Sequence, residues 1–153
     1  PHTPPPDGWH IAGCPVNGPA LAARDSLLGL AWFTRAEDRP RVQLLLSRDG
    51  GQTFGPPLLL DEDKPQGRVD LVFNEKGNAV ASWMSITAEE EATIFLAEVS
   101  PEGRLLRRSP VTTTSPARSS GFPVLKKWKD GYLLARTVVA EGSTTVSTAL
   151  LKW

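Results

Sequence analysis

The stretch SRDGGQTF, residues 47–54, decides the fold because it sets turn-forming residues between groups that can fasten a hairpin. Asp49 can accept hydrogen bonds from the backbone N–H groups of a tight turn, and Gly51 can adopt the positive φ that such a turn requires. Phe54 can return its ring between strands as an apolar anchor. A generic Asp-Gly-Gly hairpin would leave the other positions unexplained. The full spacing S-x-D-x-G-x-T-F gives a structural role to Ser47, Asp49, Gly51, Thr53 and Phe54.

The chain also repeats itself with a period of about fifty residues. Trp32 recurs as Trp83, and Ser47 recurs as Ser100 in a turn that keeps an acid and a glycine but loses the Thr-Phe ending. Each unit contains short apolar runs separated by turn residues, and helical periodicity is absent. We expect a tail that could also close the fold, followed by three units, with boundaries at 1–17, 18–64, 65–117 and 118–153.

The predicted strands form antiparallel meanders of four in the first two units and three in the last, whose outermost strand is missing. They cover residues 20–23, 28–34, 42–47, 57–60, 69–73, 79–86, 93–99, 105–112, 122–125, 132–139 and 144–152. Several of them, such as residues 27–33 and 44–46, are apolar on both alternations. Such strands suit a sheet that is packed between two neighbouring sheets. The fold class is therefore all-β, and a β-propeller portion of about three blades is favoured over a β-sandwich.

The turn at residues 47–54 resembles the Asp box of sialidase-like β-propellers. Residues 8–19 and 67–70 look like segments of bacterial proteins described as sialidase-like or exo-α-sialidase-like. The resemblance covers essentially the whole chain, as the C-terminal half of such a propeller. It implies a glycan-binding or scaffold module that is secreted or periplasmic. Two alternatives remain open: an exo-glycosidase of the sialidase type acting on acidic sugars, and a self-assembling half-propeller with a structural role.

The same resemblance implies where a ligand would bind. In such a blade the Asp box lies on the face away from the ligand, so Asp49 is expected to be a structural cap whose loss costs stability. The ligand face is expected to comprise residues 14–19, 35–41, 61–70, 85–92, 112–122 and 139–143. Sialidases hold a substrate carboxylate with arginines, because a guanidinium makes bidentate hydrogen bonds to it. The candidate ligand-binding residues on this face are Arg39, Arg68, Asp70 and Arg118.

Catalysis by this chain alone is not favoured. Sialidases add a tyrosine nucleophile paired with a glutamate and an acid/base aspartate. Tyr132 is the only tyrosine, and its place after Asp130-Gly131 predicts a packing residue on the turn side. A complete catalytic set would need residues from outside the chain.

The composition argues against several other classes of function. The chain of 153 residues carries 17 basic and 17 acidic side chains, so no overall field would recruit nucleic acid or an anionic membrane. One cysteine, Cys14, and two histidines leave little material for an internal disulfide, a zinc site or a histidine-based triad. The acidic runs 61–63 and 89–91 could hold a hard cation, but solvated charge is favoured. We therefore predict no metal, no cofactor and no membrane span.

Three units are too few to close a ring, so we expect partners. The exposed edge of the last unit invites pairing with another strand. The segment Trp9-His10-Ile11, the remaining blades of a larger propeller or a second copy of the chain could supply it.

Overall fold

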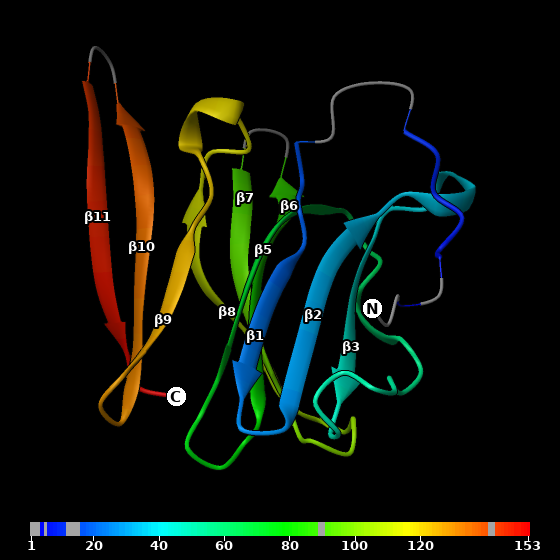
Figure 1. The fold of residues 1–153 in the computed structure, drawn as a ribbon. Helices are drawn as coiled ribbons and strands as arrows, with labels where there is room; N and C mark the ends of the chain where they lie inside the picture. Colours follow the sequence, from blue (N-terminus) through cyan, green and yellow to red (C-terminus); the bar gives the residue numbers. More distant parts are fainter. Residues whose placement is uncertain (1–3, 5, 12–15, 89–90, 141–142) are drawn as a thin grey trace.

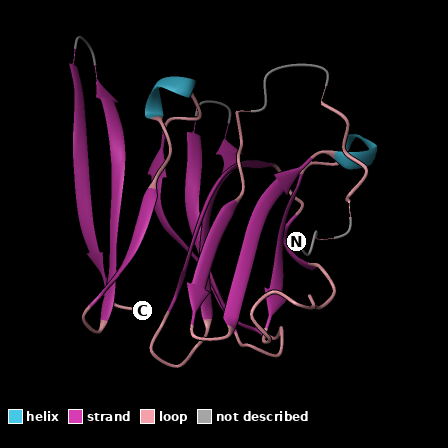
Figure 2. Cartoon of the chain, viewed as in Figure 1, coloured by secondary structure: helices cyan, strands magenta, loops and turns pink. Residues whose placement is uncertain are grey.

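The computed structural model describes the whole chain except residues 1–3, 5, 12–15, 89–90 and 141–142. Cys14, Glu89 and Glu90, which entered the predictions above, therefore lie outside the described residues. The described residues form eleven β-strands and two short 3-10 turns (Figures 1 and 2). The prediction of an all-β chain is confirmed. No helix among the described residues is both long and apolar enough to span a bilayer.

The strands form three antiparallel sheets in chain order. The first contains β1 (Ala20–Arg24), β2 (Leu27–Thr34), β3 (Arg41–Ser47) and β4 (Leu58–Asp61). The second contains β5 (Pro65–Phe73), β6 (Ala79–Ala88), β7 (Glu91–Val99) and β8 (Leu105–Thr114). The third contains β9 (Val124–Trp128), β10 (Gly131–Ala140) and β11 (Ser143–Leu151). The 3-10 turns are η1 (Ala36–Asp38) between β2 and β3, and η2 (Arg118–Ser120) before β9.

The sheets stack face to face through two apolar clusters, one at each junction. Between the first and second sheets, Leu44 and Val42 pack with Trp83, whose ring stacks on Phe95 with centroids 5.8 Å apart. Between the second and third sheets, the cluster includes Met84, Ile94, Leu125, Tyr132 and Leu134. Strands of the second sheet are thus buried on both faces, which explains their two-sided apolar sequences.

A buried carboxylate fastens the first junction. Asp61, 3% exposed at the end of β4, accepts hydrogen bonds from the indole N–H of Trp83 at 2.6 Å and from the hydroxyl of Ser85. The guanidinium of Arg108 lies 3.2 Å from the other carboxylate oxygen and also over the rings of Trp83 and Phe95. The charge of Asp61 is therefore paired and hydrogen-bonded, as a buried carboxylate must be.

On its opposite face, the first sheet has a similar contact between a carboxylate and a tryptophan. Asp7 accepts the indole N–H of Trp32 at 2.9 Å and the backbone N–H of Trp9 at 3.0 Å. Partial burial raises the pKa of Asp7, but hydrogen bonds from Thr34, Trp9 and Trp32 outweigh it and hold the pKa below its usual range. Asp61 likewise accepts the backbone N–H of the residue two positions on. Asp7 thus accepts the indole N–H of Trp32 in the first sheet as Asp61 accepts that of Trp83 in the second.

Residues 7–11 have no strand conformation. Trp9 packs edge-on against Phe33, with ring centroids 5.6 Å apart, so this segment lies against the first sheet. The first sheet and β11 lie at opposite ends of the stack (Figure 1). A role for this segment as the closing strand of the third sheet stays a prediction.

Replacing Asp61 tests the first junction. Asp61→Ala leaves four donors without their acceptor, and we expect it to lower the free energy of unfolding by about 2–4 kcal/mol. Asp63→Ala, which removes an exposed carboxylate two residues away, should change it by less than about 0.5 kcal/mol. Urea denaturation followed by tryptophan fluorescence measures both. Equal midpoints for the two variants would contradict the role of Asp61.

Candidate functional site

The site is built on an irregularity in β5. Gly67 and Arg68 both have positive φ, +80° and +51°, and the register of β5 with β6 shifts on either side of them. A Cβ on Gly67 would lie 2.7 Å from Cβ of Phe33 and 2.8 Å from Cγ of Asn17, so only glycine fits. The side chain of Asn17 holds the bulge, donating to the carbonyl of Gln66 at 2.9 Å and accepting the N–H of Arg68 at 3.0 Å. Such a bulge re-aims a side chain, here that of Arg68.

The guanidinium of Arg68 is buried and donates hydrogen bonds to several residues of the loop before β9. It donates to the hydroxyl of Ser120 at 2.6 Å, and to the carbonyls of Gly121 at 2.9 Å, Ala117 at 3.0 Å and Pro116 at 3.1 Å. Arg68 is 8% exposed, and burial lowers its pKa. One side chain of the second sheet thus fixes the path of residues 116–121 at the entrance to the third.

Every oxygen that accepts from this guanidinium is neutral. Among the described residues, the ion pairs join Arg24 to Asp25, Arg35 to Asp38, Arg108 to Asp61 and Lys127 to Glu75, and none includes Arg68. The carbonyl dipoles and the Phe122 ring, whose centroid lies 5.9 Å from the guanidinium carbon, stabilise the charge in part, but no described residue supplies a counter-charge. A low-dielectric site with an uncompensated cation favours an anion nearby.

A hollow of about 300 Å³ opens beside this group. Its lining includes no carboxylate among the described residues, and consists of Val16, Asn17, Gln66, Arg68, Pro116, Arg118 and Phe122. Arg118 is exposed at the start of η2, and Phe122 keeps 47% of its surface exposed. The buried Oε1 of Gln66 accepts no hydrogen bond from the described residues. The hollow therefore offers positive charge and an aromatic face, while the amide oxygen of Gln66 is buried behind its lining.

The predicted candidates do not all meet here. Arg68 and Arg118 both line the hollow. Asp70 does not: its carboxylate accepts the backbone N–H groups of Leu71 at 2.8 Å and Leu125 at 2.7 Å, which ties β5 to β9. Arg39 is exposed at the end of η1, on the connection between β2 and β3, and does not line the hollow. A ligand role for these residues stays a prediction.

Asn17, Gln66 and Phe122 fall within the ranges expected for the ligand face, but the sequence analysis did not single them out as candidates. Only the bulge at Gly67 and the course of residues 116–121 bring them together. Gly67 followed by Arg68 before an apolar run is the signal that could have indicated a bulge, because an isolated glycine in a strand often marks one.

The turn at residues 47–54 forms the hydrogen bonds expected of it. The Asp49 carboxylate accepts from the Thr53 hydroxyl at 2.6 Å, the Thr53 backbone N–H at 2.9 Å and the Ser47 hydroxyl at 2.7 Å. These bonds, led by that from the Thr53 hydroxyl, hold the pKa of Asp49 far below its usual range. A second hollow, about 640 Å³, lies between this turn and Pro101–Gly103 of the next sheet.

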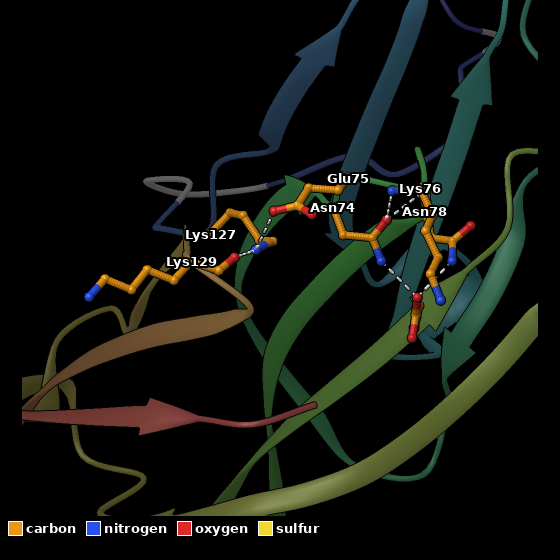
Figure 3. A network of polar contacts seen from close by, with 7 residues as sticks. Asn74, Glu75, Lys76, Asn78, Lys127 and Lys129 are labelled. Atoms are coloured by element: carbon orange, nitrogen blue, oxygen red, sulfur yellow. Dashed lines mark hydrogen bonds and ion pairs between the residues drawn. The ribbon is translucent and has the colours of Figure 1, made fainter.

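Tyr132 is 3% exposed within the cluster between the second and third sheets, which confirms the prediction of a packing residue. Burial raises the pKa of its phenol. Beside it, the turn after β5 is held by polar contacts (Figure 3): Asn74 and Asn78 both donate to Oε1 of Glu98, at 2.8 and 2.7 Å. Lys127 of β9 lies 3.4 Å from Glu75 of the same turn.

Comparison with known proteins extends only to the fold. No family model and no curated protein sequence matches the chain. Among solved structures, it resembles a xylan β-1,4-xylosidase from Bacillus halodurans C-125 with a TM-score of 0.54 and 16% identity, over 88% of this chain and 28% of that one. It also resembles the α-L-arabinofuranosidase Arb93A from Fusarium graminearum with a TM-score of 0.55 and 16% identity, over 89% of this chain and 49% of that one. The chain thus spans less than half the length of either glycosidase.

Substituting Gly67 tests whether its bulge is sterically required. Gly67→Ala meets Phe33 and Asn17, whereas Gly50→Ala, at a similar φ of +73°, meets nothing within 4 Å. Both variants carry the strain of a left-handed alanine, about 1–2 kcal/mol. We expect Gly67→Ala to lower the free energy of unfolding by a further 1–3 kcal/mol or so, from overpacking. Equal losses in chemical denaturation would contradict the steric requirement.

The Asp49 turn predicts a dependence of stability on pH. Its pKa in the folded protein lies below the value of about 3.9 expected in the unfolded chain. Its contribution is therefore complete above about pH 5 and is lost as the pH falls through the folded-state pKa. Between pH 5 and pH 2, the unfolding free energy of Asp49→Asn should fall less steeply than that of the unmodified chain.

Thr53→Val, which removes the leading hydrogen bond to Asp49, should also reduce that slope. Urea denaturation at each pH measures the three slopes. An Asp49→Asn slope equal to that of the unmodified chain would show that the turn does not stabilise the ionised carboxylate.

Proposed function

We propose that the chain is a portion of a sialidase-like β-propeller that binds an acidic glycan in the hollow beside Arg68. In this proposal residues 47–54 are an Asp box, the three sheets are blades at 18–64, 65–117 and 118–153, and further blades complete the ring. The structural likeness to two glycosidases supports a carbohydrate-related role. A secreted or periplasmic location is expected for such a module.

The uncompensated guanidinium of Arg68 carries the proposal. A sugar carboxylate in the hollow would supply the counter-charge that no described residue gives Arg68, and Arg118 could hold it with charge-assisted hydrogen bonds. The exposed ring of Phe122 suits the apolar face of a sugar ring. Arg68, already engaged by the loop, acts through its charge and by positioning Arg118 and Phe122.

Hydrolysis is the second candidate, favoured by the names of the two glycosidases that share the fold. Glycosidases commonly need a pair of carboxyl groups beside the scissile bond. The described residues that line the hollow supply none, and Asp70 caps two backbone N–H groups. An enzyme would therefore take its catalytic groups from outside this chain, and release of a fluorophore from a sialoside by a longer polypeptide would reveal it.

Calorimetric titration with N-acetylneuraminic acid and with galactose tests the binding proposal. We expect binding of the acidic sugar alone, weakened about tenfold or more by Arg118→Ala and by Phe122→Ala. Arg39→Ala is the matched control, because it removes an exposed arginine that does not line the hollow, and its affinity should stay within about twofold. Equal binding of both sugars, or an equal loss in Arg39→Ala, would reject an acidic-glycan site in this hollow.

A further inference from the structure

The third sheet exposes a row of large apolar side chains on the face that points away from the second sheet. Its exposed members are Val124, Trp128, Val139, Val146 and Leu150. In the register, Val124 pairs with Ala135, Val146 with Thr137 and Leu150 with Leu133, which are alternate residues of β10 and therefore share one face. Leu134 and Tyr132 point the other way, into the cluster against the second sheet.

The corresponding faces of the other two sheets are covered. The side chains of Val42, Leu44 and Leu46 on the first sheet are buried against the second. Those of Val80, Met84 and other residues of the second sheet are buried against the third. Val146, in contrast, is 74% exposed, although it occupies a face of the kind that the next sheet covers at both internal junctions. Exposed apolar residues gathered on one face, here with Lys126 of β9 among them, mark an interaction surface.

At the opposite end of the stack, the outer face of the first sheet exposes apolar side chains that suit such a face. Leu21 and Leu59 of the first sheet are 68% and 46% exposed. Asp7 lies against the indole of Trp32 as Asp61, at the end of a fourth strand, lies against that of Trp83. The first sheet is therefore already in contact with a segment in the position of a preceding sheet's fourth strand. The third sheet is the one that has three strands among the described residues, with β11 at its edge.

We propose that the exposed face of the third sheet binds the first sheet of a second copy of this chain. The contact repeats the order of the two internal junctions, and it places the Asp7 segment of one copy beside the open β11 edge of the other. Because the contact joins different faces of the two copies, it can be made twice, and a two-fold ring is the closed arrangement that uses it in both directions. The proposal does not depend on glycan binding, since the hollow lies within one chain.

Mass in solution, measured by light scattering during gel filtration, tests the proposal on the chain of 153 residues. We expect about twice 16.6 kDa at micromolar concentration. Val146→Asp puts a charge at the most exposed apolar residue of the face and should give 16.6 kDa. Leu106→Asp, a charge at a 48% exposed leucine of β8 outside this face, is the matched control and should leave the double mass unchanged.

Asp7→Ala removes the acceptor for Trp32 at the other end of the stack, and should raise the dissociation constant about tenfold in sedimentation. Circular dichroism checks that each variant is folded, and Leu150→Lys is a second probe of the same face if Val146→Asp is not. A single-chain mass at every concentration would overturn the proposal and assign the face to the sheets of a longer polypeptide. A double mass that persists in folded Val146→Asp and Leu150→Lys would also overturn it.

Discussion

The buried guanidinium of Arg68 is the interaction on which the candidate site depends. Its bonds to Ser120, Gly121, Ala117 and Pro116 fix the entrance to the third sheet and bring Arg118 and Phe122 to one hollow. The bulge at Gly67 is the backbone irregularity that aims it, so strain in one strand organises a loop that follows fifty residues later. The same group then gives the hollow its charge, because the described residues that accept its hydrogen bonds do so through neutral oxygens.

The contacts that join neighbouring sheets position the residues that line this hollow. The junction between the first and second sheets combines an apolar cluster with the contact of Asp61 with Trp83, and Asp7 makes a similar contact with Trp32 on the outer face of the first sheet. The turn that holds Asp49 is satisfied internally by Ser47 and Thr53 and lies outside the lining of the hollow. Stability and the proposed recognition thus rest on separate residues, which is why substitutions can test them separately.

Much of this architecture could be predicted from the sequence, because strands with two-sided apolar character and a glycine-containing turn are local signals. The strand at residues 42–47 and the turn after it are examples. The burial of Arg68 could not be predicted, since a charged residue at a loop looks solvated until a bulge turns it inward. Phe122 and Gln66 lay within the expected ligand face but were not singled out, because their meeting depends on residues that are distant in sequence. Asp70 shows the converse, a carboxylate that suits a ligand in sequence but caps two backbone N–H groups in the fold.

The central claim is that the positive charge of Arg68 favours an anionic ligand in the hollow. NMR of arginine side-chain Nε–Hε groups tests it most directly. Adding N-acetylneuraminic acid should shift the signals of Arg68 and Arg118 and leave that of Arg39 in place, whereas xylose and arabinose should shift none of them. Shifts of Arg68 and Arg118 of the same size with the neutral sugars, or no shift with the acidic one, would contradict the account.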